Sequence, residues 1–112
     1  MIVDKPWGHE IRWAINDKYL GKILHINRGA QLSRQYHEKK DETIFVLNGI
    51  LILELGEDPV KQVILKPGDS HRIKPMTIHR FKAPSDNWVK LVEVSTPEIE
   101  DVVRIEDDYG RS

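Results

Sequence analysis

Hydrophobic and polar residues alternate along short stretches of this chain, and turn-forming residues interrupt those stretches at regular intervals. A period of two residues is typical of β-strands, because successive side chains point to opposite faces. The pattern predicts strands over residues 7–13, 19–27, 35–37, 42–47, 50–55, 60–65, 70–73, 78–82 and 88–95. No stretch has a convincing helical period, so the sequence predicts an all-β sandwich or barrel.

The turns and strand faces give more detailed expectations. Asn48 and Gly49 form a strong turn signal, so we expect residues 42–47 and 50–55 to pair as a hairpin. We expect one face of the first strand to be buried and rich in aromatic side chains: Trp7, His9, Ile11 and Trp13. The conformation of the acidic tail, residues 97–112, is not determined by its pattern.

Two strands are apolar on both faces, which bears on association. Ile50 and Ile52 alternate with leucines, and Val92 and Val94 flank other apolar positions. A barrel interior buries only one face of each strand. The additional apolar faces indicate either two tightly packed sheets or a subunit interface, and we expect a homodimer.

Composition narrows the functional classes. The 112 residues correspond to one domain, 1–112, with 39% hydrophobic and 31% charged residues, as in ordinary globular proteins. The net charge of −1 gives no indication of nucleic acid or an acidic membrane as a partner. The chain has no cysteine, which excludes disulfides and thiolate metal ligands. No signal-peptide pattern or membrane-length apolar run is present, so we expect a cytoplasmic protein.

The stretch 29–49 contains candidate metal ligands. Gln35 and His37 are two residues apart, so a strand would place both side chains on one face. After a polar turn, Glu42 opens the next strand, and a hairpin would bring it level with His37. His79 is the best candidate for a fourth ligand. Two oxygen and two imidazole ligands suit a divalent ion such as zinc, manganese, iron, cobalt or nickel.

The same stretch resembles the first sequence motif of the cupin family, G-x5-H-x-H-x3-4-E-x6-G. The match runs from Gly29 through Gln35, His37 and Glu42 to Gly49, with Gln35 replacing the first histidine. This motif is specific in its spacing. The resemblance implies a double-stranded β-helix (a jelly-roll barrel), a metal site at these residues, and a dimer.

A second cupin motif, G-x5-P-x-G-x2-H-x3-N, is matched more loosely, at Gly68 and His79. Its other positions are occupied by Lys74, Met76 and Ala83. Within the family, the Gln-x-His form resembles the cupin domain of the type II mannose-6-phosphate isomerases and bifunctional mannose-1-phosphate guanylyltransferases. Residues 5–10 (KPWGHE) and 102–111 (VVRIEDDYGR) also resemble the two ends of that domain.

The resemblance implies a metal-dependent aldose–ketose isomerase acting on a sugar phosphate similar to mannose 6-phosphate. Such an enzyme needs a base that moves a proton between two carbons, and the sequence leaves Lys40, His71 and Glu93 as candidates. Glu93 shares a strand face with Leu91, and burial would raise its pKa. Basic residues near the predicted mouth could bind phosphate, although each fits an ordinary solvated surface as well: Arg34, Lys39, Lys40, Lys74, Arg80 and Lys82.

Two other functions remain open. A non-catalytic metal-containing cupin could bind a sugar or sugar nucleotide, and this is favoured by the small size and by residues 95–101, which depart from the isomerase pattern. A metal-dependent oxygenase or a sugar epimerase is the third hypothesis. An oxygenase usually needs a site rich in histidine, or two histidines and one carboxylate with open positions, so Gln35 counts against it.

Overall fold

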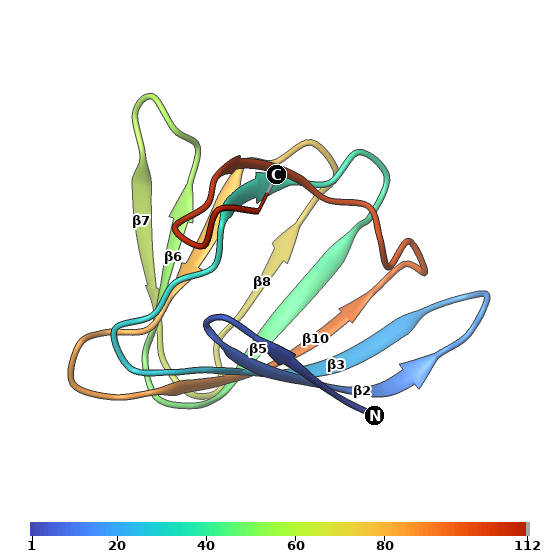
Figure 1. Ribbon diagram of the computed structural model, residues 1–112, viewed down its shortest axis with the longest axis horizontal. Coiled ribbons are helices and arrows are strands. Elements are labelled where there is room, and N and C mark those ends of the chain that lie inside the picture. The colour runs from blue at the N-terminus through green and yellow to red at the C-terminus, as the bar shows by residue number, and fades with distance from the viewer. Residues whose placement is uncertain (112) are drawn as a thin grey trace.

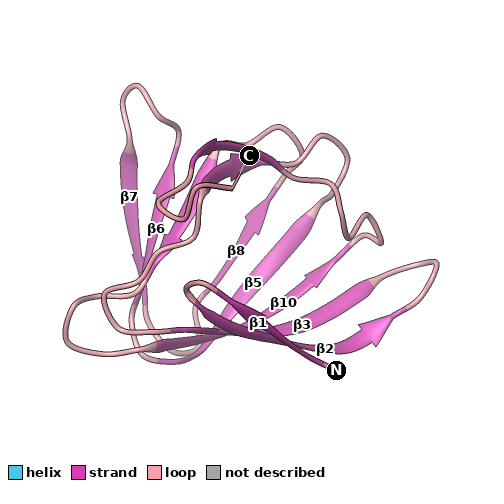
Figure 2. Cartoon of the chain, viewed as in Figure 1, coloured by secondary structure: helices cyan, strands magenta, loops and turns pink. Residues whose placement is uncertain are grey.

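The computed structural model describes residues 1–111, which form two antiparallel sheets packed face to face, without any helix in that range (Figures 1 and 2). The six-stranded sheet has the order β1 (Ile2–Lys5), β2 (Gly8–Ile15), β3 (Leu20–Ile26), β10 (Val89–Ser95), β5 (Glu42–Asn48) and β8 (Ser70–Ile73). The five-stranded sheet has the order β11 (Val103–Glu106), β4 (Arg34–Tyr36), β9 (His79–Lys82), β6 (Leu51–Leu55) and β7 (Lys61–Leu65). The predicted all-β class is confirmed. Within residues 1–111 no helix is long and apolar enough to cross a membrane.

The core lies between the sheets and is built from inward-facing side chains of both: Leu24, Ile26, Ile44, Val46, Leu51, Leu53, Phe81, Val89 and Leu91. The inner face of the six-stranded sheet is apolar at one end and polar at the other. Leu24 pairs in register with Leu91, and two positions away Lys22 pairs with Glu93. Because these rows are aligned across strands, the barrel has a hydrophobic end and a polar end, and Glu42 opens β5 at the polar end.

The prediction that residues 42–47 and 50–55 pair as a hairpin about Asn48 and Gly49 is wrong. The turn is present, but β5 pairs with β10 and β8, whereas β6 pairs with β7 and β9. The turn therefore carries the chain from one sheet to the other. Gly49 has φ of +80°, and a Cβ at this position would lie 2.4 Å from the carbonyl oxygen of Trp88, so this crossover requires glycine.

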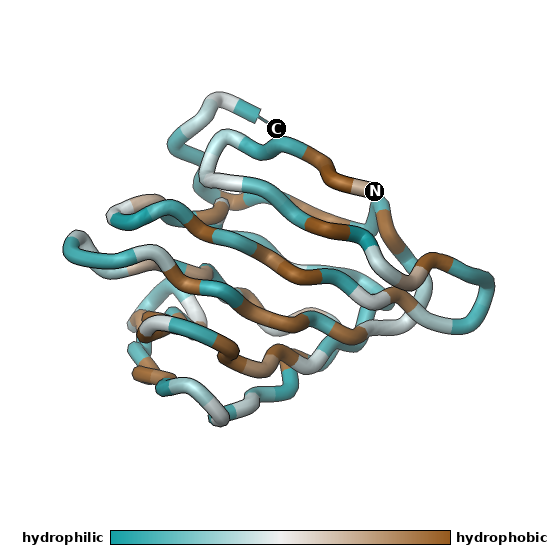
Figure 3. The backbone as a smooth tube through the Cα atoms, turned by 90° about the horizontal axis from the view of Figure 1, so that it is seen from below, coloured by the Kyte–Doolittle hydropathy of each residue, from teal (hydrophilic) through white to brown (hydrophobic). Residues whose placement is uncertain are grey.

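The prediction of a buried aromatic face on the first strand is correct only for Trp7, which is 4% exposed and lies in the core. His9, Ile11 and Trp13 lie on the opposite, outer face, and Glu10 points inward instead. The reason is that β2 crosses the polar end of the barrel, where the interior accommodates charged side chains. Hydrophobic and hydrophilic residues alternate along the strands of this sheet (Figure 3).

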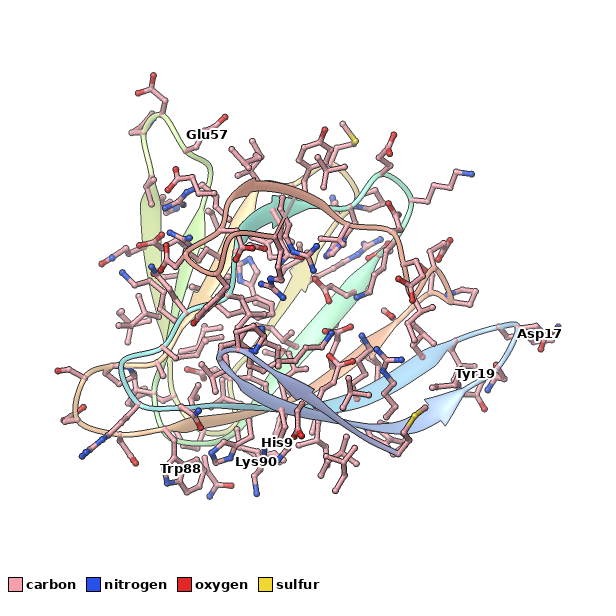
Figure 4. The ribbon with its side chains drawn as sticks, in the orientation of Figure 1. His9, Asp17, Tyr19, Glu57, Trp88 and Lys90 are labelled. Carbon is pink, nitrogen blue, oxygen red and sulfur yellow. The ribbon has the colours of Figure 1, made fainter. Side chains whose placement is uncertain are left out.

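An aromatic stack lies on this outer face. The rings of His9 and His25 are 5.0 Å apart and nearly parallel, and the ring of Trp88 follows at 4.9 Å from His25. Lys90 lies over the Trp88 ring. The side chains of His9, Trp88 and Lys90 project away from the barrel interior (Figure 4).

Two strands were not anticipated. β1 pairs with β2 at the edge of the six-stranded sheet, and β11, in the tail, pairs with β4. The tail leaves β10, passes across the polar end of the barrel and adds β11 to the opposite sheet (Figure 1). It therefore closes over the region in which the candidate site lies.

Candidate metal centre and cavity

A cavity of about 130 Å³ lies at the polar end of the barrel, between the two sheets and the tail. It is lined by residues of both sheets and by tail residues 99–102. Charged side chains dominate the lining: Lys5, Glu10, Arg12, Lys22, Lys40, Glu42, Glu93, Glu100, Asp101, Arg104 and Arg111. Of the sequence-predicted metal ligands, Gln35, His37, Glu42 and His79 all line this cavity.

Three of these residues converge closely. The Nε2 atoms of His37 and His79 lie 3.2 Å and 3.4 Å from the same carboxylate oxygen of Glu42, Oε1. All three side chains are buried, and one ligand atom from each lies within 4.8 Å of the others. They come from β5, β9 and the segment after β4, so Glu42 meets His37 across the barrel and not through the hairpin that the sequence suggested.

Backbone carbonyl groups fix the orientation of both imidazoles. His37 Nδ1 donates to the carbonyl oxygen of Asp101 at 2.5 Å, and His79 Nδ1 donates to that of Thr77 at 2.8 Å. A carbonyl oxygen can only accept, so each Nδ1 carries a proton and the Nε2 of each neutral ring is an acceptor. Both acceptors face Glu42 Oε1, a buried oxygen without a hydrogen-bond partner among the described residues.

Three buried acceptor atoms directed at one point fit a cation. Lys40, whose Nζ lies 3.5 Å from Glu42 Oε2, favours the anionic form of the buried Glu42 side chain. Two imidazoles and one carboxylate, each oriented by other groups, form a typical donor set for zinc or a first-row transition ion. The residues present therefore fit the divalent ion that the sequence indicated.

Gln35 lies beside this cluster. It pairs in register with His79 across β4 and β9, and its side chain lines the cavity. Its amide nitrogen donates to Ser33 Oγ at 3.0 Å. The amide oxygen is consequently the atom of Gln35 that can serve as a ligand. Its place in a four-residue ligand set stays a prediction.

A buried ion pair adjoins the three acceptors. Lys40 Nζ lies 2.8 Å from Glu93 Oε2 and 3.5 Å from Glu42 Oε2. Burial, together with the negative charge of Glu42, raises the pKa of Glu93, even though Lys40 opposes the shift. Glu93 is therefore a buried carboxyl group with a raised pKa inside the cavity. Lys40 and Glu93, two of the three candidate bases, are in this way brought to the site.

The third candidate base, His71, has a different position. It lies on β8 opposite Ile44 and is half-buried, but it is not among the described residues that line the cavity. The basic residues suggested for phosphate binding are also elsewhere, except Lys40. Arg34 and Lys82 bind Glu54 at 2.8 Å and 3.3 Å, in a network that also includes Arg80 and Glu106.

Sequence reasoning missed a second charged group inside the cavity, made of Lys5, Glu10, Arg12 and Lys22. Arg12 Nε lies 2.7 Å from Glu10 Oε1, and Lys22 Nζ lies 3.5 Å from the same oxygen. The signal that could have revealed it is Lys22, a charged residue on the inward face of β3, where the other side chains are apolar. The strand pattern of residues 7–13 instead suggested that Glu10 and Arg12 faced solvent.

The tail helps to build the site through Asp101. Its carboxylate accepts hydrogen bonds from three consecutive backbone amides, those of Glu38, Lys39 and Lys40, at 3.0, 2.7 and 2.9 Å. These amides outweigh the effect of burial and lower the pKa of Asp101. The same residue supplies the carbonyl group that orients His37. One tail residue therefore fixes both the 38–40 loop and the imidazole that precedes it.

This geometry agrees with the comparison with known families. The sequence profile of the cupin domain matches residues 22–95, a range that contains all three convergent side chains, His37, Glu42 and His79. The chain belongs to the cupin family. The tail and the strands β1 and β2 lie outside the matched range. Those parts of this cupin contribute Asp101, Glu10 and Arg12 to the cavity.

Individual relatives share 30% or less of their residues with this chain in the two comparisons that follow. Xanthan biosynthesis protein XanB of Xanthomonas campestris pv. campestris is 30% identical over 113 residues, covering 98% of this cupin and 24% of that protein. Mannose-1-phosphate guanylyltransferase RfbM of Salmonella typhimurium is 26% identical, over 98% of this cupin and 23% of that protein. The chain thus spans about a quarter of the length of these relatives.

Among solved structures, a sugar phosphate isomerase of the cupin superfamily, from Silicibacter pomeroyi, superposes on this chain with a TM-score of 0.68 and 22% sequence identity. The match covers 79% of this cupin and 58% of that chain. At this identity the likeness shows the fold alone.

Proposed function

We propose that this cupin is a metal-dependent isomerase that interconverts the aldose and ketose forms of a sugar phosphate similar to mannose 6-phosphate. The observation that carries the proposal is the buried convergence of His37, Glu42 and His79 next to the Lys40–Glu93 pair. The name of one similar protein, a mannose-1-phosphate guanylyltransferase, supports the substrate class.

His37, Glu42 and His79 would hold a divalent ion, with the amide oxygen of Gln35 as a fourth ligand. When bound, such an ion supplies Lewis-acid polarisation of the substrate oxygen on C1 or C2. Asp101 and Thr77 keep the two imidazoles in the tautomer that ligation requires. Because an amide is a weaker ligand than an imidazole, Gln35 would be the weakest of the four ligands.

Glu93 is the side chain that we assign to proton transfer. Isomerisation moves a proton between C1 and C2 through an enediol, and a carboxyl group with a raised pKa can both accept and return it near neutral pH. Glu93 lines the cavity and its pKa is raised chiefly by burial. Lys40, 2.8 Å away, positions this carboxylate and balances its charge when it is ionised.

A second candidate function is a non-catalytic cupin that binds a sugar or sugar nucleotide. Tail residues 99–102 favour it, because they line the cavity directly and leave it small. A bound sugar would then be recognised without turnover, and Glu93 would act only as a hydrogen-bonding group.

Metal analysis followed by an assay separates the two functions. Purified protein should contain a stoichiometric divalent ion, and it should interconvert mannose 6-phosphate and fructose 6-phosphate, with activity lost on chelation and restored by metal. A metal-replete protein that binds sugar phosphate but interconverts no hexose or pentose phosphate would support the binding function instead.

A further inference from the structure

The charged group made of Lys5, Glu10, Arg12 and Lys22 has no part in the chemistry described so far. Its side chains come from β1, β2 and β3, and all of them line the cavity. Arg12 and Lys22 are cross-strand neighbours, and both contact Oε1 of the buried Glu10. The side chains of Arg12 and Lys22 are 18% and 9% exposed, so both charges are largely withdrawn from water.

The group holds more positive than negative charge. Glu10 is the only carboxylate within ion-pair distance of these three cations among residues 1–111. Glu93, opposite Lys22, is already paired with Lys40, and the nearby Arg111 is paired with Asp107 at 3.0 Å. Three cations and one carboxylate leave an excess of two positive charges in a partly buried space, which an anion would stabilise.

The effect of this excess is visible on Lys5. Burial lowers its pKa, and the neighbouring cations Arg12, Lys22 and Arg111 act in the same direction against the attraction of Glu10. Within the described chain no carboxylate lies close enough to form an ion pair with its amino group. Lys5 can therefore turn toward a ligand without breaking an ion pair.

We propose that Lys5, Arg12 and Lys22 form an anion subsite that binds the phosphate group of the substrate. A phosphate monoester carries about 1.5 to 2 negative charges at neutral pH, which matches the excess of the group. The guanidinium of Arg12 offers paired donors, and the two ammonium groups supply charge from other directions, as a tetrahedral anion requires.

The spacing of the strands supports this assignment. Lys22 on β3 is separated from Glu42 on β5 by β10, so the two side chains start two strand spacings apart, about 10 Å. Both line the same cavity. A sugar chain with its phosphate among Lys5, Arg12 and Lys22 would extend its other end toward His37, Glu42 and Glu93. The subsite rests on the proposed function for its substrate, but not for its preference for phosphate.

Binding of inorganic phosphate, measured by calorimetry on the metal-loaded protein, tests the subsite without any turnover. The variants Lys5→Met and Lys22→Met should each weaken phosphate binding about tenfold or more, since each removes one charged hydrogen-bond donor. Lys18→Met is the matched control, because Lys18 lies in the turn between Asp17 and Tyr19, remote from the cavity (Figure 4). It should bind phosphate as the wild type does.

Acetate, titrated in parallel, distinguishes a phosphate subsite from a general carboxylate site and should bind at least tenfold more weakly than phosphate. Equal phosphate affinity in wild type and Lys5→Met, or acetate binding as tightly as phosphate, would overturn the proposal. If Lys22→Met fails to fold, Lys5→Met decides alone, because Lys5 has no ion pair in the described chain.

Phosphate binding that depends on Lys5 in a protein without isomerase activity would leave the subsite standing and refute the proposed function. An active Lys5→Met enzyme with an unchanged KM would refute the subsite and leave the proposed function standing.

Discussion

The imidazole of His37 donates a hydrogen bond to the backbone carbonyl of Asp101, 64 positions further along the chain. The carboxylate of Asp101 at the same time accepts from the amides of residues 38–40. Asp101→Ala should therefore release both the loop and the carbonyl that orients His37. Groups that orient a metal ligand typically change affinity 10- to 100-fold, so we expect the metal dissociation constant to rise by about that factor.

Competition with a fluorescent chelator measures that constant. Asp86→Ala, an exposed carboxylate in the loop before β10, is the control and should bind metal as the wild type does. Equal metal affinity in the Asp101→Ala and Asp86→Ala variants would show that the tail does not help to build the site.

His37→Ala tests the metal centre through stability. If metal binds only the folded protein, a hundredfold excess over the dissociation constant stabilises it by about 2.7 kcal/mol, roughly 10 °C in melting temperature for a domain of this size. The variant should lose that increment in metal-containing buffer and resemble the wild type under chelation. His9→Ala, on the outer face, should keep it. A metal-dependent increment that survives in His37→Ala would exclude this residue as a ligand.

Glu93→Gln separates the candidate bases. A misplaced or missing general base typically lowers the rate 10²- to 10⁴-fold, and we expect kcat to fall by about that factor with little change in KM. His71→Asn should retain near-normal kcat, since His71 does not line the cavity. Steady-state kinetics on mannose 6-phosphate provides the measurement, and the opposite ranking of the two variants would assign the proton transfer to His71.

The positions of these residues show what the sequence could and could not predict. The strand pattern identified the all-β fold, because local periodicity determines it. The resemblance to the cupin motif pointed to His37, Glu42 and His79 together, but the hairpin invoked to bring Glu42 to His37 was wrong, because these residues meet across two sheets. The inward direction of Glu10 and the role of Asp101 depend on how β2 and the tail cross the polar end of the barrel. That arrangement arises from long-range packing, which a period-two pattern alone cannot assign to an inner or outer face.

Glu54 should give stability a distinctive pH dependence. Burial would raise its pKa, but Arg34, Lys82 and Gln62 lower it below the ordinary carboxyl value of about 4.3. A lowered folded-state pKa contributes stability above the unfolded-state value, and that contribution is lost as the pH falls through the folded-state value. Glu54→Gln should therefore reduce the free energy of unfolding at neutral pH by about 2 kcal/mol, since it removes one charged hydrogen bond of Arg34 and leaves Glu106 as its remaining carboxylate partner.

Urea titrations at a series of pH values measure this difference, which should shrink toward zero as the pH is lowered below 4. Glu57→Gln, in the exposed loop between β6 and β7 (Figure 4), should follow the wild-type curve throughout. A difference between Glu54→Gln and wild type that stays constant with pH would contradict the ion-pair explanation.

The outer face of the six-stranded sheet bears on the expected homodimer. Ile11, Ile23, Val92 and Phe45 form an apolar row in register, and Phe45 and the neighbouring Val94 remain 42% and 46% exposed. We predict that the combined Phe45→Glu and Val94→Glu variant is monomeric in sedimentation experiments under conditions in which the wild type is a dimer. Ile64→Glu, on the five-stranded sheet, should remain dimeric. A monomeric wild type, or dimers in every variant, would exclude this face as the interface.

The bonds from Asp101 to the 38–40 loop also limit how parts of this domain can be exchanged between relatives. Three consecutive amides and one imidazole meet a single residue of the tail, so the length and path of the two segments have to agree. A chimaera that receives the 29–42 segment from a relative but keeps its own residues 96–111 would combine a loop and a carboxylate that no longer match. The two segments behave as one transferable unit, although residues 43–95 lie between them in the sequence.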